Sequence, residues 1–191
     1  MRKTIVSFLF LSTLIGCTTD NTVIDNPKNE SSSQSKLYKP ELIGDFNYKG
    51  PPFELDLFLA QTSPILTTIT ATLSLDSGDY VVSPYTTQDY LGVFDLVLLD
   101  STHLEFVGNL IEFPPPIDIF FSYEDLPVIS YVGSTRISRS LKISTKGDFE
   151  AKGEIFFVHE PSCVPYTISY VISRKSGELS ITKTGTQMPN C

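Results

Sequence analysis

The sequence predicts an all-β protein, a single antiparallel β-sandwich that follows a signal peptide and a flexible tether. Three observations point to this fold class. Apolar and polar residues alternate in short runs, turn residues separate these runs, and no stretch keeps a 3.6-residue period over the length of a helix. With 41% hydrophobic residues, 13 Phe and 9 Tyr, a chain of 191 residues can bury a substantial core.

The first 17 residues have the features of a lipoprotein signal. Arg2 and Lys3 precede the apolar run 5–11, and Leu14-Ile15-Gly16-Cys17 follows it. A basic start, a short apolar run and small residues before a cysteine are typical of a signal peptide whose cleavage leaves a lipidated cysteine. A transmembrane helix needs about 20 apolar residues, and this run is shorter. We therefore expect a signal peptide over 1–16 and Cys17 as the lipid attachment site.

This signal also predicts where the protein is found. Lipid attached at Cys17 anchors a protein stably to a membrane. The expected location is the bacterial cell envelope, with the chain facing the periplasm or the cell surface. Residues 18–36 are rich in Ser, Asn and Thr, a composition that does not bury enough to fold. We therefore expect a lipidated cysteine and flexible tether over 17–39, and the sandwich domain over 40–191.

Alternating runs predict the strands of the domain. The two clearest runs place their apolar residues on one face: Ile69, Ala71, Leu73 and Leu75 in 66–75, and Ile168, Tyr170 and Ile172 in 167–174. Shorter runs predict further strands at 53–59, 80–82, 94–99, 104–106, 117–121, 128–132, 136–143, 149–158 and 179–182. Short strands with frequent turns in one domain indicate a sandwich.

Turn residues separate the predicted strands at 76–79, 108–109, 146–148 and 175–178. The Ser-Gly pair at 176–177 lies between two alternating runs and predicts a hairpin. Pro114-Pro115-Pro116 predicts a rigid connection, because proline has no N–H to donate within a central strand.

The charge excludes some classes of partner. The formal net charge is −8, and removal of Arg2 and Lys3 with the signal leaves 12 basic against 22 acidic residues, or −10. An acidic surface argues against nucleic acid, which attracts basic patches. It also argues against direct binding to anionic lipid, so the expected membrane contact is the lipid anchor alone. We expect no cofactor, and a protein partner in the envelope remains open.

Cysteine usage predicts one disulfide. Lipidation of Cys17 leaves Cys163 and Cys191, and two remaining cysteines in an oxidising compartment usually pair. The bridge would close a loop of 28 residues and stabilise the fold by roughly 3–4 kcal/mol on the chain-entropy model. Two histidines and two cysteines supply a zinc site poorly, so no metal is expected.

Cys163 is also the candidate catalytic residue. A thiol near the imidazole of His159 is one route to a nucleophile of low pKa. The competing interpretation is that Cys163 is half of a structural disulfide and that His159 is a surface residue at the end of a strand. On the residues alone we favour the structural interpretation, and enzymatic activity is not expected.

Other catalytic classes find little support in the sequence. A Gly-x-Ser-x-Gly motif of serine hydrolases is missing. Five carboxylates could in principle supply an acid–base pair for glycoside chemistry, although surface carboxylates are expected at this net charge: Glu105, Glu112, Asp118, Glu124 and Asp125.

Part of the chain, from Tyr80 to about Leu179, resembles the amino-terminal periplasmic domain of the thiol:disulfide interchange protein family DsbD. The resembling segments are Tyr80-Val81-Val82-Ser83-Pro84-Tyr85, the stretch 106–114 with Gly108-Asn109-Leu110, Gly153-Glu154-Ile155-Phe156-Phe157-Val158, and Cys163-Val164-Pro165-Tyr166. The resemblance implies an immunoglobulin-like sandwich and places Cys163 at the second cysteine of the family's redox loop.

The sequence departs from this family at the first redox cysteine. The family's loop carries two cysteines about six residues apart, whereas 149–162 contains no Cys. The resemblance therefore implies a sandwich kept for binding, with its redox chemistry lost or altered. The first hypothesis is a non-enzymatic binding or accessory module in the envelope. The alternative is a thiol-disulfide interchange accessory protein that uses Cys163, with or without Cys191 as the missing partner.

Overall fold

The computed structural model describes residues 41–188, except 51, 64, 88, 89, 91, 101 and 122–126. The predicted signal peptide, Cys17, the tether and Cys191 lie outside these residues. All the regular elements described are β-strands: β1 (Glu41–Gly50), β2 (Phe53–Ser63), β3 (Leu66–Leu75), β4 (Tyr80–Val82), β5 (Asp95–Leu98), β6 (Leu104–Phe113), β7 (Ile117–Ile119), β8 (Val128–Val132), β9 (Ser134–Ile143), β10 (Phe149–His159), β11 (Val164–Lys175) and β12 (Glu178–Gln187). The predicted all-β class is confirmed.

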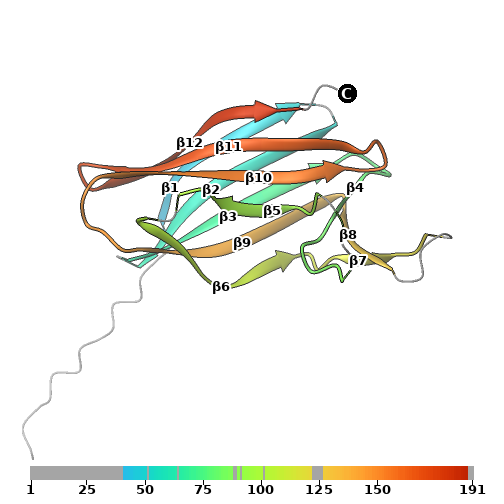
Figure 1. Ribbon diagram of the computed structural model, residues 1–191, viewed down its shortest axis with the longest axis horizontal. Coiled ribbons are helices and arrows are strands. Elements are labelled where there is room, and N and C mark those ends of the chain that lie inside the picture. Colours follow the sequence, from blue (N-terminus) through green and yellow to red (C-terminus); the bar gives the residue numbers. More distant parts are fainter. Residues whose placement is uncertain are drawn as a thin grey trace, which may run out of the picture. The chain divides into compact units, whose positions relative to one another are not determined.

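The strands form an antiparallel, immunoglobulin-like β-sandwich (Figure 1). One layer is the five-stranded sheet β1-β2-β3-β9-β6. The other layer contains the four-stranded sheet β12-β11-β10-β5, with the three-stranded sheet β4-β8-β7 at one end. A bridge between Tyr80 and Glu160 joins the second and third sheets. The sandwich therefore has a distinct end, formed by β4, β7 and β8.

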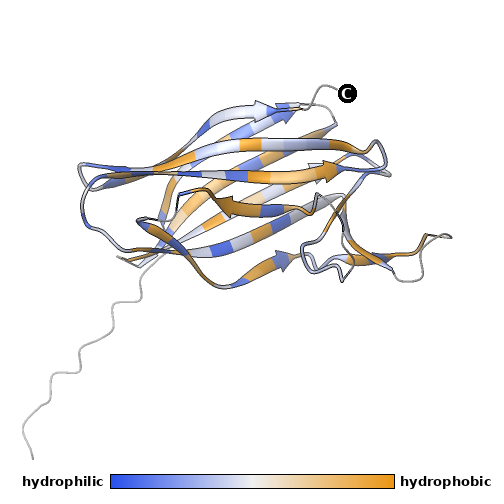
Figure 2. Cartoon of the chain, viewed as in Figure 1, coloured by the Kyte–Doolittle hydropathy of each residue, from blue (hydrophilic) through white to orange (hydrophobic). Residues whose placement is uncertain are grey.

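Alternation along the strands builds the core, as predicted (Figure 2). Ile69, Ala71 and Leu73 of β3 are buried, and so are Ile168, Tyr170 and Ile172 of β11. Leu55, Leu57 and Leu59 of β2 are also buried on the inner face of the five-stranded sheet. Burial of a large aliphatic or aromatic side chain contributes about 1.5–3 kcal/mol, so these inner faces supply most of the driving force for folding.

The predicted hairpin at 175–178 is confirmed. Lys175 pairs with Glu178, and Ser176 and Gly177 have φ values of 53° and 88°. Two consecutive residues with positive φ match the right-handed twist of the flanking strands, and glycine adopts this conformation without strain. The turn at 76–79 is also present, although it carries the chain from β3 in one sheet to β4 in another.

One predicted turn is wrong. Gly108 and Asn109 lie within β6, which continues to Phe113. Val107 pairs with Ser140 and Ile111 with Ser138, so the extra residues bulge out while the strand continues. Gly108 has φ 73°, which suits a bulge as well as a turn. Beyond the bulge, β6 continues as a second half that ends at Phe113. The three prolines then form the connection to β7, as predicted.

Strand β1 is a further difference from the prediction, which named no strand at 41–50. This strand covers the edge of the five-stranded sheet and pairs with β2. Its burial is only partial, since Phe46 and Tyr48 pack against the core while Asp45, Asn47 and Lys49 are exposed. No helix long and apolar enough to cross a membrane occurs in the part of the chain that the structure describes.

Candidate functional site

Cys163 lies at the end of the loop that joins β10 to β11, and its side chain is exposed. Its Sγ donates a hydrogen bond to Oε2 of Glu160 at 3.2 Å. This hydrogen bond and the negative charge of Glu160 raise the pKa of Cys163 above the usual value for a thiol. A nucleophilic cysteine needs the opposite shift. The local environment therefore does not favour the low-pKa nucleophile considered from the sequence.

The interpretation of His159 as a surface residue is wrong. His159 is 3% exposed, because it occupies the last inward-facing position of β10. Its Nδ1 lies 2.7 Å from Oγ of Ser162, and its Nε2 lies 2.9 Å from Oδ2 of Asp79. Both ring nitrogens therefore have partners other than the thiol of Cys163. The imidazole links the β10–β11 loop to the turn between β3 and β4.

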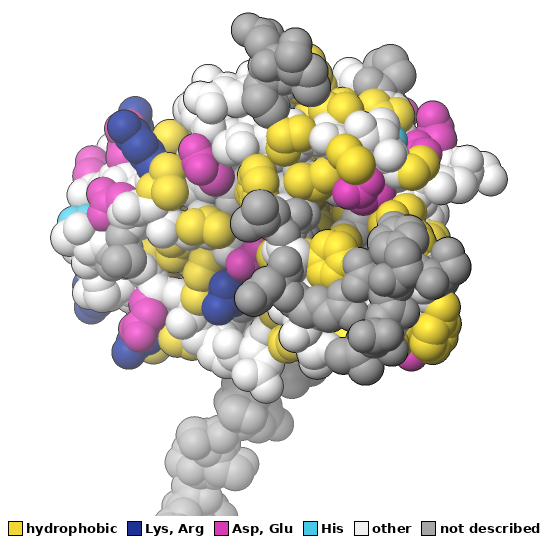
Figure 3. Space-filling view, turned by 45° about the vertical axis from the view of Figure 1, so that its right-hand side comes forward, with side chains coloured by type: hydrophobic (Ala, Val, Ile, Leu, Met, Phe, Trp, Pro, Cys, Tyr) yellow, Lys and Arg dark blue, Asp and Glu magenta, His cyan; other side chains and the backbone are white. Residues whose placement is uncertain are grey.

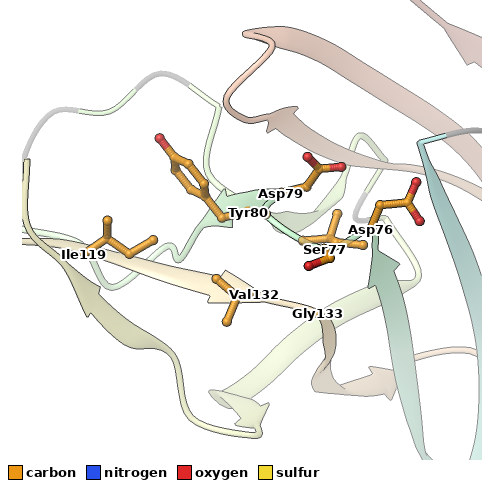
Figure 4. A pocket seen from close by; sticks show the side chains of 9 residues that line it. Asp76, Ser77, Asp79, Tyr80, Ile119, Val132 and Gly133 are labelled. Carbon is orange, nitrogen blue, oxygen red and sulfur yellow. The ribbon is translucent and has the colours of Figure 1, made fainter.

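This turn forms one wall of a hollow of about 660 Å³ (Figure 4). Asp76 and Asp79 contribute carboxylates from the turn. Ile119 of β7 and Val132 of β8 line it with apolar side chains. Because Asp79 is also held by His159, the same contact that fixes the β10–β11 loop fixes this wall of the hollow.

Glu112 is partly buried, in contrast to the surface position expected from the net charge. It lies near the end of β6, where Ser83 donates a hydrogen bond to its Oε1 at 2.8 Å and the hydroxyl of Tyr131 donates to the same oxygen. Burial raises the pKa of Glu112, and the hydrogen bond from Ser83 opposes that shift. Ser83 and Tyr131 belong to the β4–β8 end, so Glu112 ties the second half of β6 to that end of the sandwich.

Large apolar side chains are exposed around the same end. Six of them form what we call the β6–β7 apolar surface: Tyr85, Ile111, Phe113, Ile117, Phe120 and Val132. Phe120 is 75% exposed and Ile111 is 66% exposed. Figure 3 shows hydrophobic side chains gathered on this side of the molecule, with acidic side chains among them.

Strand pairing and chain connections place several of these residues at the same end of the sandwich. The hydroxyl of Tyr85 donates a hydrogen bond to the carbonyl of Leu110, beside the exposed half of β6. Ile117 of β7 pairs with Ser130 of β8, the strand that carries Val132. Phe113 and Ile117 are separated only by the three prolines. The sequence reasoning did not identify this surface, although the short strand predicted at 117–121 contains two of its residues.

The described residues contain no group of three or more His, Cys, Asp and Glu side chains that could hold a metal ion. Among the three cysteines predicted as site residues, the structure describes only Cys163, since Cys17 and Cys191 lie outside the described part, as do Glu124 and Asp125 of the candidate carboxylates. The predicted lipid attachment and the predicted Cys163–Cys191 disulfide thus remain predictions.

Comparison with known proteins identifies no relative by sequence: no family model matches the chain, and no curated protein matches it. Among solved structures, the chain is similar to the GAE domain of GGA2p from Saccharomyces cerevisiae, with 8% identity, a TM-score of 0.31, and coverage of 80% of this chain and 98% of that one. It is also similar to the GAE domain of yeast GGA1, with 14% identity, a TM-score of 0.28, and coverage of 75% and 96%. The resemblance to the DsbD domain stays a prediction.

Proposed function

We propose that this protein is a lipid-anchored protein of the bacterial cell envelope whose β-sandwich binds a protein partner and has no enzymatic activity. The observation that carries the binding role is the β6–β7 apolar surface. The anchoring role rests on the sequence Leu14-Ile15-Gly16-Cys17. An anchored sandwich with an exposed apolar end is suited to holding a partner near the membrane.

The apolar surface supports binding because its exposure is costly. Each large apolar side chain left in water forgoes about 1.5–3 kcal/mol of burial free energy. Single exposed apolar residues are common, whereas a group of them marks an interaction site. Here six such residues, including two phenylalanines, gather on neighbouring elements at one end of the sandwich. The raised pKa of Cys163 adds to the preference for binding over thiol chemistry.

Site-specific photocrosslinking tests the binding role. The full-length lipoprotein, produced in its own cells, would carry p-benzoylphenylalanine in place of Phe120 or Ile117. We expect both positions to form an adduct with the same protein, because a bound partner covers both side chains. The matched control replaces Glu178, which is exposed in the β11–β12 hairpin at the opposite end. Adducts that form equally well at 178, or at none of the positions, would contradict the proposal.

Lipidation makes a separate prediction. Cys17→Ser removes the sulfur that carries the lipid, so we expect loss of incorporated palmitate label and loss of the processed, membrane-bound form. The measurement is metabolic labelling followed by membrane fractionation. Cys163→Ser serves as the control and should label normally. If the Cys17→Ser protein still takes up the label and stays with the membrane, the anchor assignment is wrong.

The alternative function is thiol-disulfide interchange through Cys163, with or without Cys191. The exposure of Cys163 is the observation in its favour. We expect instead that Cys163 and Cys191 are joined in a structural bridge, so thiol counting on unreduced mature protein should find no free thiol. A structural bridge should have a reduction potential below about −300 mV. Two free thiols would refute the bridge, and a more oxidising bridge would favour interchange.

A further inference from the structure

The hollow beside the apolar surface has a distribution of charge that selects among partners. Asp76 is exposed on the turn and lines the hollow, and Asp79 of the same turn lines it as well. Glu160 lies one residue beyond β10 at the same end and is bridged to Tyr80, which also lines the hollow. The acidic residues that line the hollow are thus Asp76 and Asp79 on the turn, and Ile119 and Val132 give it apolar side chains (Figure 4).

The described basic side chains at this end are already engaged. Lys49 pairs with Glu54 at 3.3 Å. The guanidinium of Arg136 lies over the ring of Phe113, with Cζ 5.3 Å from the ring centroid. His159 is buried against Asp79. Nζ of Lys183 lies 4.8 Å from the centroid of the Tyr48 ring. The remaining described lysines lie toward the opposite end, in the second half of β9, the β9–β10 loop, the first half of β10 and the β11–β12 hairpin: Lys142, Lys146, Lys152 and Lys175. The opening is thus both acidic and apolar.

We propose that this hollow and the adjoining β6–β7 apolar surface receive an extended protein segment in which a lysine or arginine lies next to a large apolar side chain. The inference rests on the proposed binding function and names the chemistry of its partner. The cationic group would lie near Asp76, and the apolar side chain against Ile119 and Val132.

Charge repulsion also disfavours binding of a second copy of the chain or of an anionic membrane to this surface. A second copy of the chain would bring the same carboxylates and a net charge of −10 in its mature form, so the two acidic ends would repel each other. The anionic surface of a membrane would be repelled for the same reason. The negative potential of this end repels a second copy and an anionic membrane, but it attracts a basic segment. Complementary charge also accelerates the association of such a segment.

Fluorescence anisotropy with defined peptides tests the inference. The lipidated full-length mature chain is placed in nanodiscs of zwitterionic phosphatidylcholine, and empty nanodiscs serve as the blank. The probes are three labelled ten-residue peptides that alternate lysine with leucine, glutamate with leucine, or lysine with serine. We expect the lysine–leucine peptide to bind at least about tenfold more tightly than either of the others, a difference of about 1.4 kcal/mol.

Charge reversal locates the binding. Asp76→Lys should weaken binding of the lysine–leucine peptide about fivefold, because it replaces attraction by repulsion at an exposed position. Glu178→Lys changes the net charge equally at the opposite end and should change the affinity less than twofold. Asp76→Asn, which adds no new cation, should fall between the wild type and Asp76→Lys. Circular dichroism of each variant checks that the fold is kept.

The outcomes separate this inference from the proposed function. Equal binding of the glutamate–leucine peptide, equal effects of Asp76→Lys and Glu178→Lys, or no binding of any probe would overturn the basic-partner inference. Crosslinks from positions 117 and 120 would then still support a binding surface with a partner of different chemistry. A dimer by analytical ultracentrifugation that Phe120→Ser disrupts would instead assign the surface to a second copy and overturn the inference.

Discussion

Replacing Phe157 with alanine is expected to lower the free energy of unfolding by about 3–5 kcal/mol. Phe157 is fully buried on β10. Its ring centroid lies 4.9 Å from that of Phe53, 5.7 Å from Phe94 and 5.5 Å from Tyr166. These rings come from both layers of the sandwich and from the segment before β5, so truncation opens a cavity at the junction of three elements. Loss of edge-to-face contacts adds to the loss of buried area.

Urea unfolding of the mature chain measures this effect. Phe120→Ala is the matched control, because Phe120 is 75% exposed and its truncation should change stability by no more than about 0.5 kcal/mol. Phe157→Leu keeps most of the volume and should cost less than Phe157→Ala, which gives a measurable variant if the alanine protein fails to fold. Equal losses for Phe157→Ala and Phe120→Ala would contradict the packing described for β10.

The face of each long strand could be predicted from sequence because alternation is a local property. In β3 and β11, every second residue is apolar, and the backbone of a strand places every second side chain on one face. The same argument assigns Phe157 to the core. Residues 45–49 of β1 also alternate, with Asp45, Asn47 and Lys49 exposed and Phe46 and Tyr48 partly buried. This run holds only two large apolar residues, so it predicts a strand less strongly than the runs of the central strands.

Contacts between distant segments could not be predicted in this way. Asp79 and His159 are 80 positions apart, and nothing local to either residue indicates that they meet. Likewise, the burial of Glu112 depends on Ser83 and Tyr131, which come from other strands. Gly108 was misassigned for a different reason: a glycine with positive φ occurs both in turns and in β-bulges, so the residue type does not distinguish them. Which one forms depends on whether the partner strand continues beside it.

The same distinction between local and long-range features applies to the candidate site. Cys163 was identified from sequence because cysteines are few, and the structure places it in an exposed loop. The pKa shift at Cys163 has the opposite sign to that of a nucleophile, because the neighbouring group is the carboxylate of Glu160. The β6–β7 apolar surface is a property of assembled elements. Ile111 and Phe113 are exposed on the second half of β6, where Glu112 between them contacts Ser83 and Tyr131 of other strands.

Gly153→Ala is expected to destabilise the protein by about 1–3 kcal/mol, because the added methyl group has no space. A Cβ atom at Gly153 would lie 2.3 Å from Cζ of Tyr170 and 2.5 Å from its hydroxyl oxygen. Gly153 and Tyr170 are paired across β10 and β11. The ring cannot move away easily, since it is fully buried and its hydroxyl donates a hydrogen bond to the carbonyl of Val97 on β5 at 3.2 Å.

Thermal and urea unfolding of three variants test this packing. Gly185→Ala in β12 of the same sheet is the matched control, because its added Cβ would meet nothing closer than Ser169 at 3.9 Å, and its effect should stay within about 0.5 kcal/mol. Tyr170→Leu removes the ring and should itself destabilise the core. The double variant should be less destabilised than the sum of Gly153→Ala and Tyr170→Leu, because the clash exists only when both the methyl group and the ring are present. Strict additivity, or equal effects at 153 and 185, would show that the Tyr170 ring does not lie over Gly153 in solution.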